Sequence, residues 1–240
     1  FILGDCFEHM TRLADCSVDM VLCDLPYGTT QNKWDSVLPL DALWREYWRI
    51  CKPNAAVVLT AQTMFTAKLM LSAEQEHRYN LVWEKTKAGG FLNAKRMPLQ
   101  AHEDICVFYR KMPTYQPQME AGKPYTKKAV SDGDGKNYGK FERAGVTVVN
   151  EGVRYPRSVL KFENGNHGAI HPTQKPVALF EYLIRTYSNP GDMVLDNTAG
   201  SGTTAVAAEN AGRRWVCIEN DPDHYATAAG RLRAHLELVA

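Results

Sequence analysis

The spacing of apolar residues along the chain predicts strands that alternate with helices. Mainly apolar runs occur at 18–23, 55–60 and 193–196, as is typical of strands buried on both faces of a parallel sheet. Apolar residues at helical spacing follow the first two runs, in 40–51 and in 65–70. This alternation favours an α/β fold with a doubly wound, mostly parallel sheet that is covered by helices.

The same pattern divides the chain into three parts. Two β-rich stretches at 79–83 and 104–109 complete the first part. From 111 to 168 the periodicity fades while Gly, Pro, Lys, Tyr and Asn accumulate, which predicts a loop-rich lobe. Regular elements resume at Pro176 with a helix, a strand, a glycine-rich turn, a second helix and a further strand. We therefore expect an α/β domain in two halves, 1–110 and 169–240, with a lobe at 111–168 inserted between them.

The composition is that of a globular protein without a membrane span. Of the 240 residues 45% are hydrophobic and 23% charged, and no apolar run approaches the roughly 20 residues that a span needs. The six cysteines are scattered singly, without a C-x-x-C pair, so we expect no metal site. The sequence begins with Phe1 rather than Met and has no basic segment before an apolar one, so we expect a few preceding residues and a cytoplasmic location.

The net charge of +1 conceals an uneven distribution along the chain. Residues 84–175 hold 16 Lys and Arg against 9 Asp and Glu, whereas the remainder holds 12 against 18. Basic residues interleaved with aromatic ones suit contact with the phosphates and bases of a nucleic acid. The alternative is a solvated, Lys-rich insertion without a partner. The candidate nucleic-acid contacts are Lys123, Lys127, Lys128, Lys136, Lys140, Arg154 and Arg157.

The segment Asp24-Leu25-Pro26-Tyr27-Gly28 follows the first predicted strand. A carboxylate at the carboxyl end of a strand stands in the crevice where open α/β sheets bind ligands, and Pro26 steadies the carbonyls beside it. Asp24 and the Leu25 carbonyl can both accept hydrogen bonds from one amino group, while Tyr27 offers a flat face to a base, worth about 1–3 kcal/mol. The segment therefore predicts a site for an exocyclic amine on an aromatic ring. The alternative is an ordinary turn, which also favours Asp, Pro and Gly.

A glycine-rich turn and a distant acid predict a nucleotide-containing cofactor. Residues 199–204 follow the strand that ends at Asp196, and the next strand is followed by Glu219, which suits a ribose diol. No Lys follows the second glycine, which excludes the phosphate loop of nucleotide hydrolases, and Ala205 replaces the third glycine of the dinucleotide fingerprint. S-adenosylmethionine has a ribose and a carboxylate but no pyrophosphate, so we favour it over a dinucleotide once Asp24-Leu25-Pro26-Tyr27 is taken into account.

The order of these segments resembles that of the β-class DNA amino-methyltransferases, over nearly the whole chain. In that family the catalytic motif comes first, the target-recognition region second and the cofactor motif last. Asp24-Leu25-Pro26-Tyr27 resembles the family's D-P-P-Y, and residues 196–204 resemble its D-P-F-A-G-S-G-T-T. Leu25 replaces the first proline and Asn197-Thr198 replace Pro-Phe, but neither change removes a group that the chemistry needs. Residues 83–104 are also similar to phage and prophage members.

The resemblance implies the S-adenosylmethionine-dependent methyltransferase fold and a role for each part of the chain. Residues 1–110 would form the catalytic half, 111–168 the target-recognition lobe and 169–240 the cofactor-binding half. The segment 171–176 looks like the one that closes over the methionine part of the cofactor, and 3–6 like the strand end near its adenine. The catalytic residues would be Asp24, Leu25, Pro26 and Tyr27. The cofactor contacts would be Asp5, Cys6, Asp24, His171, Thr173, Lys175, Asp196, Thr198, Ala199, Gly200, Ser201, Gly202, Thr203, Glu219 and Asn220.

The implied activity is site-specific methylation of DNA at the N6 amine of a flipped-out adenine. Hydrogen bonds from that amine to Asp24 and to the Leu25 carbonyl would localise its lone pair and stabilise the positive charge that develops on nitrogen. The base would leave the duplex and stack on Tyr27. The resemblance further implies double-stranded DNA as substrate, a homodimer, a cognate restriction endonuclease as partner, and a bacterial or phage-infected cell.

Other activities stay open at this stage. N4-cytosine methylation uses the same grip on an exocyclic amine, although Asp as the first motif residue favours adenine. Methylation of a protein glutamine usually goes with Asn at that position, so Asp24 and the basic lobe argue against it. A DNA-binding module without enzymatic activity would not need the complete cofactor half.

Some single residues also allow two interpretations. Lys175 is either a cofactor contact or a solvated loop residue, and Asp5 is either a cofactor contact or the N-cap of a helix that begins at Cys6 or Phe7. Trp34 and Asp35 follow the catalytic segment and are candidates for the lining of the base pocket, and for Trp34 the alternative is a core residue.

Overall fold

The computed structural model describes residues 1–240 apart from 30–34, 130–132, 135–139, 143, 165–173 and 240. The chain forms two compact units, one made of Phe1–Gln116 with Ser158–Ala240 and the other of Pro117–Arg157. Within the described part of the chain, no helix is long and apolar enough to cross a bilayer.

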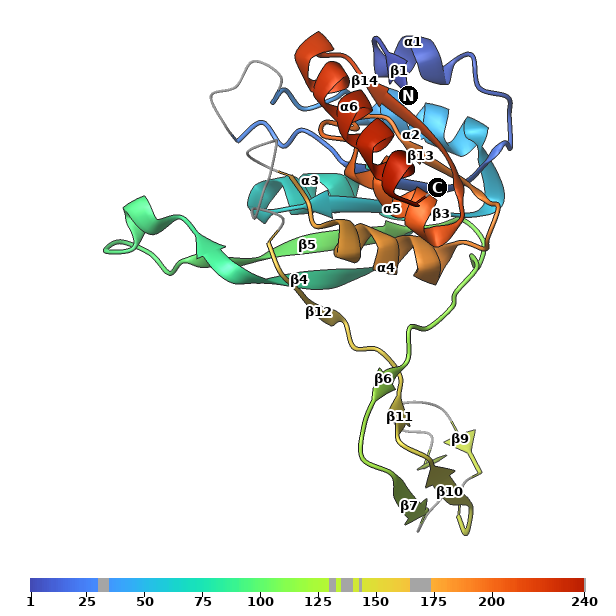
Figure 1. The fold of residues 1–240 in the computed structure, drawn as a ribbon. Helices are drawn as coiled ribbons and strands as arrows, with labels where there is room; N and C mark the ends of the chain where they lie inside the picture. The colour runs from blue at the N-terminus through green and yellow to red at the C-terminus, as the bar shows by residue number, and fades with distance from the viewer. Residues whose placement is uncertain (30–34, 130–132, 135–139, 143, 165–173, 240) are drawn as a thin grey trace. The chain divides into compact units, whose positions relative to one another are not determined.

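An eight-stranded, mostly parallel sheet forms the centre of the larger unit (Figure 1). Among the described strands of this sheet, β5 alone runs against its neighbours, because it pairs antiparallel with β3 and β4 while the other pairs are parallel. Across the sheet the strands are β1 (Ile2–Leu3), β14 (Arg214–Glu219), β13 (Met193–Asp196), β2 (Val18–Asp24), β3 (Cys51–Ala61), β5 (Gln100–Phe108), β4 (His77–Gly89) and β12 (Val159–Phe162). This sheet confirms the one expected from the apolar runs.

Helices cover both faces of the sheet because successive residues of a strand point to opposite sides. In β2, Val21 and Cys23 pack with α1 (Cys6–Met10), α2 (Leu40–Ile50) and α3 (Thr63–Ser72). Met20 and Leu22 of the same strand pack with α4 (Val177–Tyr187) and α5 (Thr203–Ala211). The last helix, α6 (Pro222–Val239), packs through Leu232 against residues of α5 and β14.

The path of the chain across the sheet reverses between β2 and β13. These strands are neighbours, but β2 leads to β3 on one side while β13 leads to β14 on the other. Open α/β sheets bind ligands at such a switch point, outside the carboxyl ends of the strands. Asp24 closes β2 and Asp196 closes β13, so both carboxyl groups lie at this crevice.

The predicted elements of the larger unit are present, with shifts at their ends. The helix expected to reach Cys51 ends at Ile50, and Cys51 begins β3. The reason is Pro53, which disfavours helical backbone at the residue before it. The strand expected at 79–83 is much longer in the structure, because β4 continues its pairing with β5 as far as Gly89 and Gln100.

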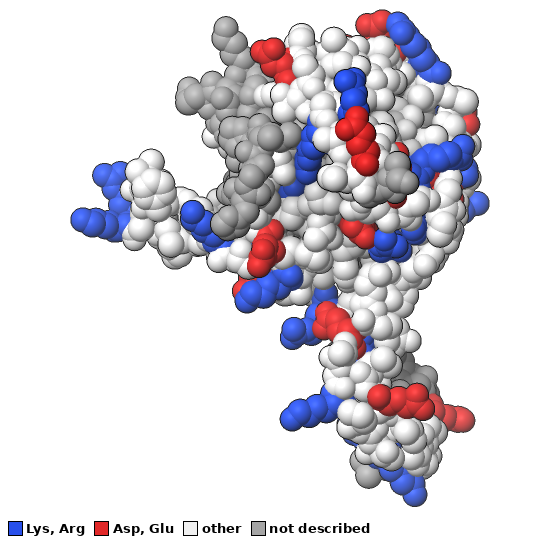
Figure 2. Space-filling view, viewed as in Figure 1, with Lys and Arg blue, Asp and Glu red and all other residues white. Residues whose placement is uncertain are grey.

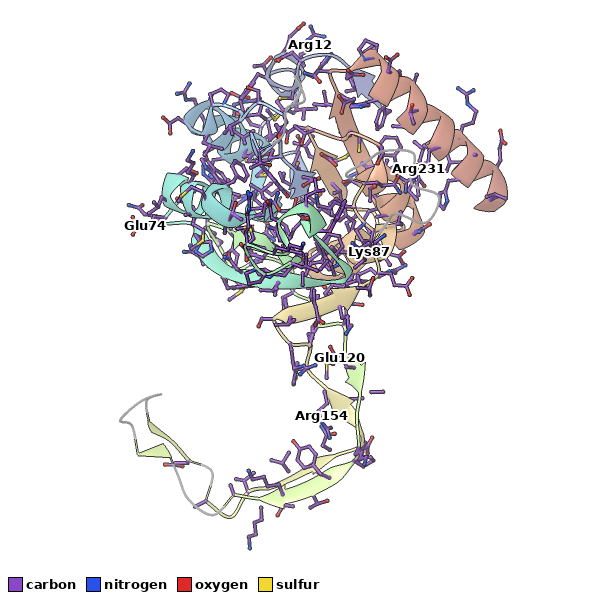
Figure 3. All side chains as sticks on the ribbon, turned by 90° about the vertical axis from the view of Figure 1, so that its left-hand side faces the viewer. Arg12, Glu74, Lys87, Glu120, Arg154 and Arg231 are labelled. Atoms are coloured by element: carbon purple, nitrogen blue, oxygen red, sulfur yellow. The ribbon has the colours of Figure 1, made fainter. Side chains whose placement is uncertain are left out.

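The smaller unit, Pro117–Arg157, is built from short antiparallel pairs. β6 (Glu120–Ala121) pairs with β11 (Val153–Arg154), β7 (Tyr125–Lys128) with β10 (Thr147–Asn150), and β8 (Gly133–Asp134) with β9 (Lys140–Phe141). Arg154 braces this unit, since its guanidinium donates to the Lys123 carbonyl and lies 4.8 Å from the ring centroid of Tyr125 (Figure 3). The sequence predicts a wider lobe, 111–168, but the flanking residues belong to the larger unit, where β12 joins the sheet.

Candidate active site

A cavity of about 700 Å³ opens at the carboxyl ends of β2, β13 and β14. Its walls come from the segment after β2, the glycine-rich turn after β13, and Glu219 at the end of β14. All catalytic and cofactor candidates in the described residues line this cavity except Gly202, while His171 and Thr173 lie outside the described residues. The cavity is in the size range of small-molecule sites.

The Asp24 carboxylate is held from two directions. Its Oδ1 accepts hydrogen bonds from the Tyr27 hydroxyl at 2.7 Å and from Thr60 Oγ1 at 2.5 Å. Its Oδ2 accepts a hydrogen bond from Lys175 Nζ at 2.6 Å. Because a carboxylate offers about four lone-pair directions, this arrangement leaves one acceptor position, on Oδ2.

Two buried ion pairs continue from Lys175 to the far wall of the cavity. Glu103 lies between Lys175 and Lys85, with Nζ–Oε distances of 3.3 Å and 2.5 Å. The contact of Lys175 with Glu103 Oε2 is an ion pair without hydrogen-bond geometry, whereas Lys85 forms a close ion pair with Glu103 Oε1. Two cations thus balance two carboxylates, as buried charges require. We call Asp24, Thr60, Lys85, Glu103 and Lys175 the Asp24 cluster.

Lys175 keeps its proton in this cluster. Burial alone lowers the pKa of the Lys175 ammonium, but the carboxylates of Asp24 and Glu103 outweigh that effect and raise the pKa above its usual value. The sequence left Lys175 between a cofactor contact and a solvated residue. The structure places it at 7% exposure, with its charge on Asp24.

Tyr27 is neutral and turned towards Asp24. Burial raises the pKa of its hydroxyl well above the usual value, and the negative charges of Asp24 and Glu103 add to the rise. Its ring stacks on Phe65 of α3 with centroids 5.1 Å apart. Phe65 therefore supports the aromatic platform that the sequence assigns to Tyr27 alone.

The loop after Tyr27 is closed by Asp35. Its two carboxylate oxygens accept hydrogen bonds from the backbone N–H groups of Gly28 and Thr29, both at 2.8 Å. Gly28 has φ +69°, and a Cβ there would lie 2.9 Å from Val37, so glycine is required. Asp35 is nearly buried and lines the cavity. Its place in a base pocket stays a prediction. Trp34 lies outside the described residues.

The glycine turn, residues 199–204, approaches the cavity through its backbone. Gly200 and Gly202 have φ +49° and +74°, and the Ala199 N–H donates to the Ile218 carbonyl. The Gly200 N–H donates to Glu219 Oε2 at 2.7 Å, which ties the turn to the end of β14. Arg231 of α6 donates to the Ser201 carbonyl at 2.9 Å on the outer side of the turn (Figure 3).

Asp196 is buried and holds residues at both ends of the glycine turn. Its carboxylate accepts hydrogen bonds from the Thr198 N–H at 3.1 Å and from Thr204 Oγ1 at 2.5 Å. Burial raises its pKa to about 7, against the lowering effect of these hydrogen bonds. Asn197, which replaces the family's proline, is fixed in the core by the Tyr47 hydroxyl, 2.5 Å from its Oδ1.

The residues of the cavity fit S-adenosylmethionine. Gln174 Oε1 is buried in the cavity wall and has no hydrogen-bond partner among the described residues, so it needs a polar partner. Each Glu219 oxygen accepts one backbone hydrogen bond and keeps a lone pair for a hydroxyl group. Asp5 is the N-cap of α1, since it accepts a hydrogen bond from the Glu8 N–H, and it also lines the cavity. Its contact with the cofactor stays a prediction.

The basic DNA-contact candidates fall mostly in the smaller unit. Lys123, Lys127 and Lys128 are exposed there, and Arg157 is its last residue. Arg154 is half-buried and uses its guanidinium inside the unit. Lys136 lies outside the described residues, and for Lys140 the structure describes only the backbone, in β9.

Sequence reasoning missed Thr60, Lys85 and Glu103. Each comes from a different strand, and the pairing of Glu84 with His102 brings Lys85 and Glu103 together across β4 and β5. A signal was present: both residues lie in the stretch 83–104 that resembles other family members. Their role could not be recognised before the two strands were paired.

Comparison with known proteins decides the family. The family model for the N6/N4 methyltransferases, described as DNA methylase, matches residues 18–230. The chain belongs to this family. The DNA adenine methyltransferase YhdJ of Escherichia coli K12 is 27% identical over 249 residues, which cover 96% of this chain and 81% of YhdJ.

Solved structures show the same fold for this DNA methylase. M1.HpyAVI in complex with S-adenosylmethionine superposes with a TM-score of 0.64 at 23% identity, covering 96% of this chain and 98% of the other. The cytosine-N4-specific PvuII methyltransferase superposes with a TM-score of 0.70 at 16% identity, covering 95% of this chain and 84% of the other. TTHA0409 of Thermus thermophilus in complex with S-adenosylmethionine superposes with a TM-score of 0.63 at 22% identity, covering 97% of this chain and 94% of the other.

These findings confirm the fold and the family that the motifs predict. They also confirm, for the family, the expected cofactor S-adenosylmethionine, which is bound in M1.HpyAVI and TTHA0409. The similarity to phage members stays a prediction.

Proposed function

We propose that this DNA methylase transfers a methyl group from S-adenosylmethionine to the N6 amine of an adenine that has left the duplex. The observation that carries the proposal is the Asp24 carboxylate, held by Lys175 and Thr60 beside the glycine turn, with one acceptor position left on Oδ2. The adenine specificity named for YhdJ and the Asp at the first motif position support N6 over N4.

The Asp24 cluster would prepare the amine. The N6 lone pair is delocalised into the ring, so the amine is a poor nucleophile until its hydrogens are fixed. Asp24 Oδ2 and the Leu25 carbonyl would each accept one amino hydrogen, which localises the lone pair and stabilises positive charge on nitrogen. Because Lys175 holds its charge 2.6 Å from Oδ2, Asp24 acts mainly as an acceptor and the proton leaves to solvent.

The other side of the cavity would hold the methyl donor. When bound, S-adenosylmethionine supplies a methyl group on a positively charged sulfur. The glycine turn would position it through backbone groups, and Glu219 would accept hydrogen bonds from the ribose. Thr198 Oγ1 donates to the Asp24 carbonyl at 3.2 Å, so the two sides are linked directly.

The remaining assignments follow from the DNA substrate. The smaller unit would recognise the target sequence, with Lys123, Lys127, Lys128 and Arg157 on phosphates. The flipped base would stack against Tyr27, whose ring Phe65 supports. A homodimer, a cognate restriction endonuclease and a cytoplasmic location in a bacterial or phage-infected cell stay predictions of the resemblance.

The decisive experiment identifies the methylated nucleoside. Unmethylated plasmid DNA would be incubated with the protein and S-adenosylmethionine carrying a labelled methyl group, digested, and separated by mass. We expect N6-methyladenine with the wild type, none with Asp24→Ala, and wild-type yield with Glu74→Ala, which removes an exposed carboxylate (Figure 3). N4-methylcytosine would overturn the choice of base, and an active Asp24→Ala variant would overturn the mechanism.

A further inference from the structure

A two-stranded arm leaves the sheet where β4 and β5 continue past the cavity. Its strands pair in regular register from Tyr79 and Val107 to Glu84 and His102, and the next pair is Gly89 with Gln100. In between, β4 has three more residues than β5. The short 3-10 helix η1 (Phe91–Asn93) follows Gly90, whose φ of +82° suits glycine. Figure 1 shows this arm as a projection of the larger unit. We call residues 86–101 the β4–β5 arm.

The arm exposes large apolar side chains beside cations. Phe91 is 77% exposed, Leu92 84% and Met97 59%. The stretch 85–102 also contains Lys87, Lys95 and Arg96 but no Asp or Glu, and the arm carries only basic and uncharged atoms on the face in Figure 2. Exposed apolar residues at the end of a projection whose charges are all positive mark a surface that binds another molecule.

The base of the arm is fastened to the wall of the cavity. The Asn164 side chain accepts from the Lys87 N–H at 3.0 Å and donates to the Lys87 carbonyl at 2.9 Å (Figure 3). On the other strand, Gln100 Nε2 donates to Gln62 Oε1 at 2.8 Å. Asn164 and Gln62 both line the cavity. The arm therefore starts at the rim of the site on the side of Lys85 and Glu103.

We propose that the β4–β5 arm binds duplex DNA next to the target nucleotide. Phe91 and Leu92 form an apolar wedge against the base steps that the flipped base leaves, and Lys95 and Arg96 contact phosphates. Proteins that unstack DNA use apolar wedges of this kind, and phosphate contacts set their register. The polyanionic backbone complements a surface with cations and no acid. This inference rests on the proposed transfer to duplex DNA, but not on the choice of base.

The wedge is tested with a Phe91→Ala/Leu92→Ala variant on a duplex that contains the mapped target site. We expect kcat/KM for this duplex to fall about tenfold or more, since base–side-chain stacking is lost. On a duplex with a mismatched partner opposite the target, where unstacking is already easier, the loss should shrink to about threefold or less. The matched control is Leu71→Ala/Leu238→Ala, which truncates equally exposed residues at the far ends of α3 and α6.

The phosphate contacts are tested by measuring how a Lys95→Ala/Arg96→Ala variant binds the same duplex. The slope of log affinity against log salt should become shallower by up to about 2, while the Kd for S-adenosylmethionine and Tm stay at wild-type values. The control replaces exposed Lys68 and Arg233 by Ala and should keep the wild-type slope.

Two outcomes would overturn the proposal. One is wild-type turnover and salt slope in both arm variants. The other is an arm variant whose molecular mass in solution is half that of the wild type and whose DNA affinity per protomer is unchanged. That result would make the arm an interface between copies of the chain. A wild-type protein that methylates no DNA would instead remove the proposed function itself, so the two failures are distinguishable.

Discussion

The two sides of the cavity are built in opposite ways. The Asp24 cluster joins side chains from β2, β3, β4, β5 and the segment before α4, and it depends on ion pairs between residues far apart in the sequence. The glycine turn and most of its partners come from one stretch, 196–219, with Arg231 as an outside partner, and they depend on hydrogen bonds to backbone groups. Charge therefore organises the side that we propose for the base, while backbone geometry organises the side that we propose for the cofactor.

The difference predicts opposite responses to mutation. A buried ion pair fails when one partner is lost, because the remaining charge stays without compensation. A backbone site tolerates many side-chain changes but fails where the main chain needs a positive φ. Each side can thus be disturbed in a way that should spare the other.

The largest effect is expected from Glu103→Ala. It leaves Lys85 and Lys175 facing each other without the carboxylate between them, so the free energy of unfolding should fall by about 3–5 kcal/mol. Methyl transfer should fall further than binding of S-adenosylmethionine, as measured by denaturation, kcat and calorimetric Kd. The double variant Lys85→Met/Glu103→Gln restores the charge balance and should recover part of the stability. No recovery would mean that packing, rather than charge, holds this side.

The second prediction concerns the pH dependence of stability on the cofactor side. Burial raises the pKa of Asp196 to about 7, whereas the ordinary value is 3.8, so the folded chain retains a proton that the unfolded chain releases. The free energy of unfolding contributed by Asp196 is fully present below about pH 4 and falls as the pH rises to about 7, by up to about 1.4 kcal/mol for each pH unit. Denaturation at pH 5, 6, 7 and 8 should show this slope in the wild type and not in Asp196→Asn. Equal slopes would contradict it.

Gly202→Ala tests the backbone of the glycine turn. The new Cβ would lie 3.2 Å from that of Ala228 at φ +74°, so we expect a loss of about 1 kcal/mol in stability and a weaker Kd for S-adenosylmethionine. Gly212→Ala is the control, since it has φ +68° at the other end of α5 with open space around the new Cβ. It should cause a similar strain but leave the Kd unchanged. If both variants bind the cofactor equally well, the turn does not position it.

The smallest effect is expected from Thr60→Val. It removes one hydrogen bond to Asp24 while keeping the shape of the side chain, so stability should fall by about 1 kcal/mol or less. Asp24 would keep Lys175, and kcat should fall by less than in Glu103→Ala. A fall in kcat as large as that of Glu103→Ala would show that orientation of Asp24 by Thr60, rather than the ion pairs, dominates the acceptor side.

How far the site could be predicted depends on how local its contacts are. Asp24, the glycine turn and Glu219 were recognised because each stands at a strand end whose position the apolar runs reveal. Lys85 and Glu103 are separated by 18 residues of sequence, and nothing local indicates that they meet. The β4–β5 arm was missed for the same reason, since two β-rich stretches do not reveal how far their pairing extends.

The sequence by itself determined the order of strands and helices in the larger unit and the strand-end motifs, because these depend on periodicity and on residues adjacent in the chain. The resemblance of those motifs to a known family implied the class of reaction. Only the tertiary structure decided that Lys175 bonds to Asp24, that Glu103 joins two lysines, and that Phe65 backs Tyr27. Such contacts arise when the sheet brings distant segments together, so their partners are set by strand pairing and burial.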